Sequence, residues 1–136
     1  AGSGLLIGVD LLKDHDILEA AYNDAEGITA EFNLNLLDRL RNEMGWDIQR
    51  ERFSHRAVFN AQQSRIEMHL DSRVSQVLTV DDNPIRFREG ESIHTENSYK
   101  YSVPGFQRLA QRAGFSSRRV WTDKDELFSV HYLTST

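Results

Sequence analysis

The most informative absence in this sequence is that of cysteine, which occurs nowhere among its 136 residues. Without a thiol, the chain cannot contain a disulfide scaffold, a thiolate metal site or a cysteine nucleophile. The absence fits a reducing compartment, so we expect a cytoplasmic protein. The five histidines are scattered, with no i, i+4 pair and no nearby acid at ligand spacing, so we also expect no metal site.

Long apolar runs and an excess of positive charge are missing as well. No apolar run approaches the roughly 20 residues that a membrane helix needs, and the short run at residues 5–9 lacks the charged flank of a signal peptide. Acidic residues outnumber basic ones by 21 to 16, which gives a net charge of −5. We therefore expect neither nucleic acid nor a membrane as a partner. The pair Arg118-Arg119 is interpreted as a solvated strand edge.

What is present is an ordinary globular composition, with 39% hydrophobic and 27% charged residues. Residues 5–9 form a continuous apolar run, which is typical of a central strand in a parallel sheet. Such a strand needs parallel neighbours on both sides, and this predicts further strands upstream of the chain. Gly2-Ser3-Gly4 precedes this strand and does not follow one, so it is not a glycine-rich nucleotide loop.

Two helices are predicted next. Asp14 can cap a helix over residues 15–22. Thr29 can cap a second helix that ends at Met44, with Gly45 in the position that stops helices.

The period of the apolar residues then changes from helical spacing to alternation, which indicates antiparallel strands with one wet face. Ser102 with Pro104 opens a last helix that Gly114 ends, and the polar residues 123–126 join a terminal hairpin. The expected strands cover residues 55–62, 66–70, 74–80, 85–88, 118–122 and 127–133.

Glu96 and Ser98 are the pair most suited to bind a small polar group. In extended backbone, residues two apart point to the same side of the strand. A carboxylate that accepts and a hydroxyl that donates or accepts suit an imidazole, with its one donor and one acceptor nitrogen. From the residues alone, an exposed loop with a capping serine remains the alternative. Tyr22 can pack its ring and leave its hydroxyl wet, and Met68 shares an apolar strand face typical of a core.

Several stretches, in order along the chain, resemble the histidine Nα-methyltransferase family. These S-adenosylmethionine-dependent enzymes make trimethylhistidine on the route to ergothioneine. The stretches are residues 5–11 (LLIGVDL), 21–24 (AYND), 29–35 (TAEFNLN), 65–70 (RIEMHL), 93–101 (IHTENSYKY), 120–123 (VWTD) and 127–133 (LFSVHYL).

The resemblance implies an α/β fold: the C-terminal portion of a class I, Rossmann-like methyltransferase sheet with an inserted α+β substrate-binding lobe. Residues 1–22 and 102–136 would belong to the methyltransferase core, and residues 23–101 to the lobe. The main site for S-adenosylmethionine would lie in an N-terminal methyltransferase segment outside this chain. The isolated chain is therefore expected to be inactive, and to self-associate through its apolar first strand.

The resemblance also assigns roles to four residues, as the substrate-binding part of an enzyme that methylates L-histidine. Glu96 and Ser98 match residues that grip the substrate side chain, Tyr22 matches one that fixes its amino-acid end, and Met68 matches one that lines the imidazole pocket. No catalytic residue or general base can be named. The alternatives are an indole amino-acid N-methyltransferase of the same family and, for the isolated chain, a non-catalytic binding or interaction module.

Overall fold

A computed structural model describes residues 2–136 and divides the chain into two compact units. The terminal unit contains the residues up to Asp14, together with Ala61–Arg65 and Tyr99–Thr136. The middle unit contains His15–Asn60 and Ile66–Ser98.

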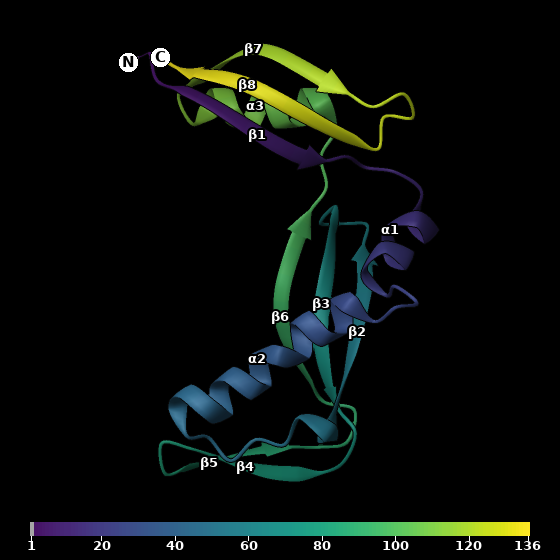
Figure 1. The fold of residues 1–136 in the computed structure, drawn as a ribbon, viewed down its shortest axis with the longest axis vertical. Coiled ribbons are helices and arrows are strands. Elements are labelled where there is room, and N and C mark those ends of the chain that lie inside the picture. Colours follow the sequence, from purple (N-terminus) through teal and green to yellow (C-terminus); the bar gives the residue numbers. More distant parts are fainter. Residues whose placement is uncertain (1) are drawn as a thin grey trace. The chain divides into compact units, whose positions relative to one another are not determined.

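The terminal unit is a three-stranded antiparallel sheet with one helix against it (Figure 1). The strand order is β1-β8-β7, so the last strand of the chain lies in the centre. The apolar core of this unit lies between the sheet and the helix and contains Val9, Phe106, Ala110 and Leu133. The elements are β1 (Gly4–Asp10), α3 (Val103–Arg112), β7 (Phe115–Thr122) and β8 (Phe128–Ser135).

The expectation of parallel neighbours on both sides of the first strand is wrong for one side, because the neighbour that the described residues supply is antiparallel. Strand β1 pairs antiparallel with β8, from Gly4 opposite Thr134 to Asp10 opposite Phe128, and is an edge strand there. Its side chains are not buried on both faces, since Leu6 is 65% exposed. An apolar run shows that a segment is hydrophobic, but it does not show whether the neighbouring strand is parallel or antiparallel. Here the neighbouring strand is β8 of the terminal hairpin, and it is antiparallel. The Rossmann-like class is therefore not confirmed by residues 2–136 and stays a prediction.

The exposed edge of β1 leads to a prediction about association. We expect the purified chain to self-associate through this strand, because unpaired backbone beside exposed Leu5 and Leu6 favours pairing with another copy. Leu6→Lys should shift the population towards monomer, whereas Leu12→Lys, at an exposed leucine outside the strand, should not. Sedimentation across a concentration series measures both, and a wild-type monomer at high concentration would contradict the prediction.

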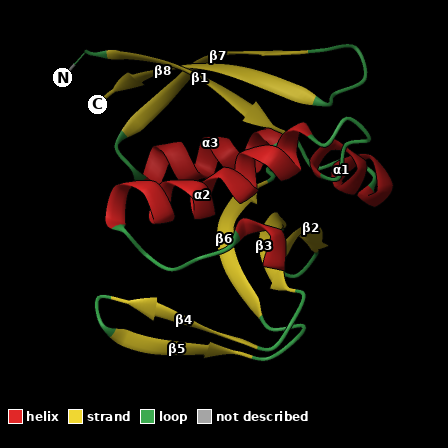
Figure 2. Cartoon of the chain, turned by 60° about the horizontal axis from the view of Figure 1, so that its bottom comes forward, coloured by secondary structure: helices red, strands yellow, loops and turns green. Residues whose placement is uncertain are grey.

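The middle unit contains two helices, a three-stranded sheet of order β2-β3-β6 and a separate hairpin of β4 and β5 (Figure 2). A short 3-10 turn at Arg50–Arg52 precedes β2. The elements are α1 (His15–Tyr22), α2 (Ile28–Met44), β2 (Phe53–Asn60), β3 (Arg65–Ser72), β4 (Gln76–Val80), β5 (Asn83–Phe87) and β6 (Ser92–Tyr99).

Strand β3 carries the cleanest pattern in the middle unit, and the predicted alternation is confirmed. Ile66, Met68 and Leu70 are buried, while the residues between them are half-exposed. Leu70 packs with Leu37 of α2. Ile66 and Met68 pack with Leu18 of α1. We expected helix α1 to belong to the methyltransferase core. In the structure it lies in the middle unit, because its one buried leucine packs into the apolar core of that unit.

Two of the predicted helix ends are confirmed and one is wrong. Ser102 caps α3 by accepting a hydrogen bond from the backbone N–H of Gly105, and Gly45 ends α2 with a φ of 71°. Thr29 does not cap α2, which begins one residue earlier. Instead the Asp24 carboxylate accepts from the N–H groups of Ile28 (2.8 Å) and Thr29 (3.0 Å). None of the helices in residues 2–136 is long and apolar enough to cross a bilayer.

A buried ion pair stabilises the terminal unit. Lys100 is only 2% exposed, and its Nζ lies 2.8 Å from Oδ2 of Asp10. The Nζ of Lys13 lies 2.6 Å from the other oxygen of the same carboxylate. Burial raises the pKa of Asp10, but the hydrogen bonds from Lys100 and Lys13 outweigh it and hold that pKa below its ordinary value.

Candidate functional site

Tyr22 and Ser98 lie 76 positions apart in the sequence, and the structure brings them into contact. Tyr22 is the last residue of α1, and its hydroxyl lies 2.8 Å from Oγ of Ser98 on β6, with either group able to donate. The ring of Tyr22 packs against the buried cluster that contains Met68, which is 3% exposed. Three of the four predicted site residues therefore meet at one place in the middle unit.

Hydrogen bonds between α1 and β2 hold Tyr22 in that position. The side chain of Asn23 donates to the carbonyl of Ala57 (2.9 Å) and accepts from its N–H (3.0 Å), as a neighbouring strand would. The carboxylate of Glu19 accepts from the N–H of Phe59 at 2.8 Å. This bond lowers the pKa of Glu19, so the carboxylate stays charged at neutral pH.

Glu96, the fourth predicted residue, lies on β6 two positions before Ser98 and is exposed. It lines a hollow of about 220 Å³ between β6 and α2. Phe32, which is 68% exposed, gives this hollow an aromatic wall. The hollow is lined by Phe32, Asn33, Asn35, Leu36, Arg39, Thr95 and Glu96.

A buried amide on α2 connects the segments that carry Tyr22 and Glu96. The Nδ2 group of Asn33 donates to Nδ1 of His55 (3.0 Å) and to the carbonyl of His69 (3.2 Å). Its Oδ1 accepts from the hydroxyl of Thr95 at 2.7 Å, next to Glu96. His55 in turn directs Nε2 to the carbonyl of Tyr22 at 2.9 Å. The His55 ring thus bridges the amide of Asn33 and the backbone of Tyr22.

Asn33 and His55 were not predicted as site residues. The available signal was weak: an asparagine within a helix and facing its buried side is unusual, because the amide must find partners there. The partners come from three strands further along the chain, β2, β3 and β6, so the sequence could not show that Asn33 has them.

The opposite face of β3 holds a second cluster, of Glu67, His69 and His94. Nε2 of His69 lies 3.3 Å from Oε2 of Glu67, and its ring stacks on that of His94 with centroids 4.6 Å apart. Burial lowers the pKa of His69, and the neighbouring charges of Arg56 and His94 act in the same direction. The Glu67 hydrogen bond opposes this shift without cancelling it.

One coordinating atom from each of the three side chains could reach a common metal ion, since these atoms all lie within 4.8 Å of one another. From the sequence we expected no metal site, and this cluster was not noticed. Glu67 and His69 are only two positions apart on a strand, and His94 comes from the next strand in the sheet.

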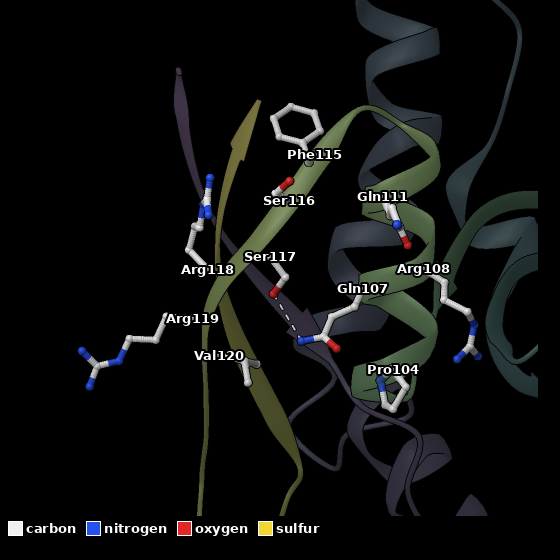
Figure 3. Close-up of a pocket in the computed structure, with 10 residues that line it drawn as sticks. All are labelled: Pro104, Gln107, Arg108, Gln111, Phe115, Ser116, Ser117, Arg118, Arg119 and Val120. Atoms are coloured by element: carbon white, nitrogen blue, oxygen red, sulfur yellow. Dashed lines mark hydrogen bonds between the residues drawn. The ribbon is translucent and has the colours of Figure 1, made fainter. Parts of the chain in front are cut away.

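A larger hollow than the one beside Glu96 lies in the terminal unit between α3 and β7, with a volume of about 720 Å³ (Figure 3). It contains none of the four predicted site residues. Gln107 donates to Ser117 across it at 3.2 Å. The guanidinium groups of Arg108, Arg118 and Arg119 point away from one another in Figure 3, so they do not form a clamp for an anion.

Comparison with known proteins gives a consistent result. The profile of a family described as histidine-specific methyltransferase, SAM-dependent, matches residues 1–135. The chain is 38% identical over 124 residues to the histidine N-alpha-methyltransferase of Mycolicibacterium smegmatis. It is 37% identical over 125 residues to the protein of the same name from Mycobacterium tuberculosis. Each alignment covers 90% of this chain but only 39% of the relative.

Proposed function

Because the chain belongs to the family of histidine-specific, S-adenosylmethionine-dependent methyltransferases, we propose that it is the substrate-binding part of an amino-acid Nα-methyltransferase. The proposed reaction converts L-histidine to trimethylhistidine in ergothioneine biosynthesis, in the cytoplasm. The observation that carries this proposal is the convergence of Tyr22, Ser98 and Met68, with Glu96 two positions before Ser98 on β6.

The chemistry of these four groups supports histidine as the substrate. The carboxylate of Glu96 accepts only, whereas the hydroxyl of Ser98 both donates and accepts, so together they can serve the two different nitrogens of an imidazole. The apolar thioether of Met68 suits the face of a flat ring. The phenol of Tyr22 can donate to the carboxylate of an amino acid or accept from its ammonium group. An indole has a single donor and would leave part of this set unused, which makes it the less favoured substrate.

The main pocket for the methyl donor is proposed to lie outside this chain. In the described residues, no glycine-rich loop leads from a strand into a helix, and the early glycines precede β1. The chain spans 39% of the length of the curated relatives it matches. We therefore assign to this chain the binding and orientation of the amino acid, and place the main cofactor site outside it.

A paired assay tests the proposal. A full-length protein that includes this chain is expected to transfer methyl groups from S-adenosylmethionine to the α-amine of histidine, with mono-, di- and trimethylated products seen by mass spectrometry. The 136-residue chain alone is expected to give no product and no micromolar binding of S-adenosylmethionine in a calorimetric titration. Failure of the full-length protein to methylate histidine would overturn the substrate, and tight cofactor binding by the chain alone would overturn the division of roles.

A further inference from the structure

The polar face of the middle unit's sheet carries a ligand set that the proposed methylation does not use. Glu67 and His69 are two positions apart on β3 and therefore point to the same side, away from buried Ile66, Met68 and Leu70. His94 joins them from β6, the next strand in the sheet. We propose that Glu67, His69 and His94 bind one divalent transition-metal ion.

The distances fit one small ion. Two donor atoms in a tetrahedral shell with metal bonds of about 2.0–2.1 Å lie roughly 3.3 Å apart. The 3.3 Å between Nε2 of His69 and Oε2 of Glu67 equals this separation, and it is long for a charge-assisted hydrogen bond. His94 offers a ligand atom within 4.8 Å of those of the other two residues, so a small shift of its exposed side chain would complete the set.

Neighbouring groups form hydrogen bonds with the three side chains and orient them, as residues that hydrogen-bond to metal ligands do in known metal sites. Asn60 donates to Oε1 of Glu67 at 2.9 Å, and the other oxygen of that carboxylate is the one that faces His69. Nε2 of His94 lies 3.2 Å from the carbonyl oxygen of Glu96 and 2.8 Å from Oδ1 of Asn97, both acceptors. These contacts engage Nε2, so Nδ1 is the nitrogen of His94 that is left to face a metal.

The local charge permits a cation. Arg56 lies near His69, but its guanidinium is engaged by the Asp71 carboxylate at 2.6 and 2.9 Å, which compensates its charge. One carboxylate and two imidazoles then face the ion.

The donor types select the class of metal. Two imidazole nitrogens and one carboxylate oxygen suit Zn²⁺, Co²⁺ or Ni²⁺, whereas Mg²⁺ and Ca²⁺ prefer oxygen donors throughout. Three protein ligands leave a position for water. A bound ion would join β3, which carries Met68, to β6, which carries Glu96 and Ser98.

Metal titration of the tag-free, chelator-treated chain tests the site. Calorimetry with zinc chloride is expected to show one ion per chain, and zinc is expected to raise the melting temperature. His94→Gln and His69→Gln should each weaken binding at least tenfold, and Glu67→Gln should also weaken it by removing the negative charge. The matched control is His15→Gln, because His15 forms an exposed pair with Glu19 at 3.0 Å that lacks a third ligand.

Two results would overturn the proposal: no stoichiometric zinc binding to the wild-type chain, or equal affinity in the His94→Gln and His15→Gln variants. His94 is exposed, so its replacement is expected to leave the fold intact. Circular dichroism of each variant checks this. The comparison therefore stays decisive even where His69→Gln does not fold.

Discussion

Asp10→Ala is expected to lower the free energy of unfolding by about 3 kcal/mol at neutral pH, the lower end of the range for breaking a buried ion pair. The substitution removes the carboxylate that lies 2.8 Å from the ammonium of the buried Lys100. The lower end applies because the Asp10 side chain itself is 29% exposed. Denaturant unfolding followed by circular dichroism measures the difference. Glu43→Ala is the matched control, because the Arg39–Glu43 pair lies on the surface, where such pairs contribute little.

The effect of Asp10→Ala should depend on pH in one direction. Since the folded pKa of Asp10 is lowered, the charged carboxylate contributes stability that is fully present above its unfolded pKa of about 4. This contribution is lost as pH falls through the lower folded pKa. The difference between wild type and variant should therefore shrink in acid. A difference that stays constant from neutral to strongly acidic pH would show that Asp10 acts through packing and not through its charge.

Glu96→Ala in a full-length protein is expected to lower kcat/KM for histidine by one to two powers of ten. The reasoning rests on the proposed function. A hydrogen bond from a desolvated imidazole N–H to a carboxylate contributes about 1.5–3 kcal/mol, and each 1.4 kcal/mol is about a factor of ten. Tryptophan lacks the imidazole, so its turnover should fall much less and the histidine-to-tryptophan ratio should drop. The measurement is kcat/KM for both amino acids in wild type and variant.

Glu89→Ala, at an exposed glutamate before β6, serves as the control and should change neither rate nor ratio. A melting curve of each variant separates loss of binding from loss of fold. If the Glu96→Ala variant keeps the wild-type melting temperature and the wild-type histidine-to-tryptophan ratio of kcat/KM, Glu96 does not contact the imidazole. The main argument for histidine as the substrate would then fail.

Local structure was predicted well where the residues that determine it lie within one short segment. Alternation in β3, the Ser102 cap of α3 and the Gly45 end of α2 depend on residues within a few positions of one another. Thr29 was predicted to cap α2, but the helix already begins at Ile28, because the Asp24 carboxylate accepts hydrogen bonds from the N–H groups of Ile28 and Thr29.

Features that depend on a distant partner could not be predicted in this way. The direction of β1 is decided by β8, which lies at the other end of the chain. The resemblance assigned both Tyr22 and Ser98 to substrate binding, but the hydrogen bond between them was not predicted, since neither residue has a local pattern that marks it. The grouping of Glu67 with His94 was missed for the same reason, because only the sheet brings the two strands together.

The buried amide of Asn33 limits how substrate preference can evolve in this fold. Its nitrogen positions the backbone of Tyr22 through His55, and its oxygen holds Thr95 beside Glu96. The two ends of the proposed binding site are therefore not independent modules. A mutation that reshapes one end by moving β2 or β6 disturbs the amide's partners at the other end. New specificities are more accessible through exchange of side chains on the existing backbone than through remodelling of either strand.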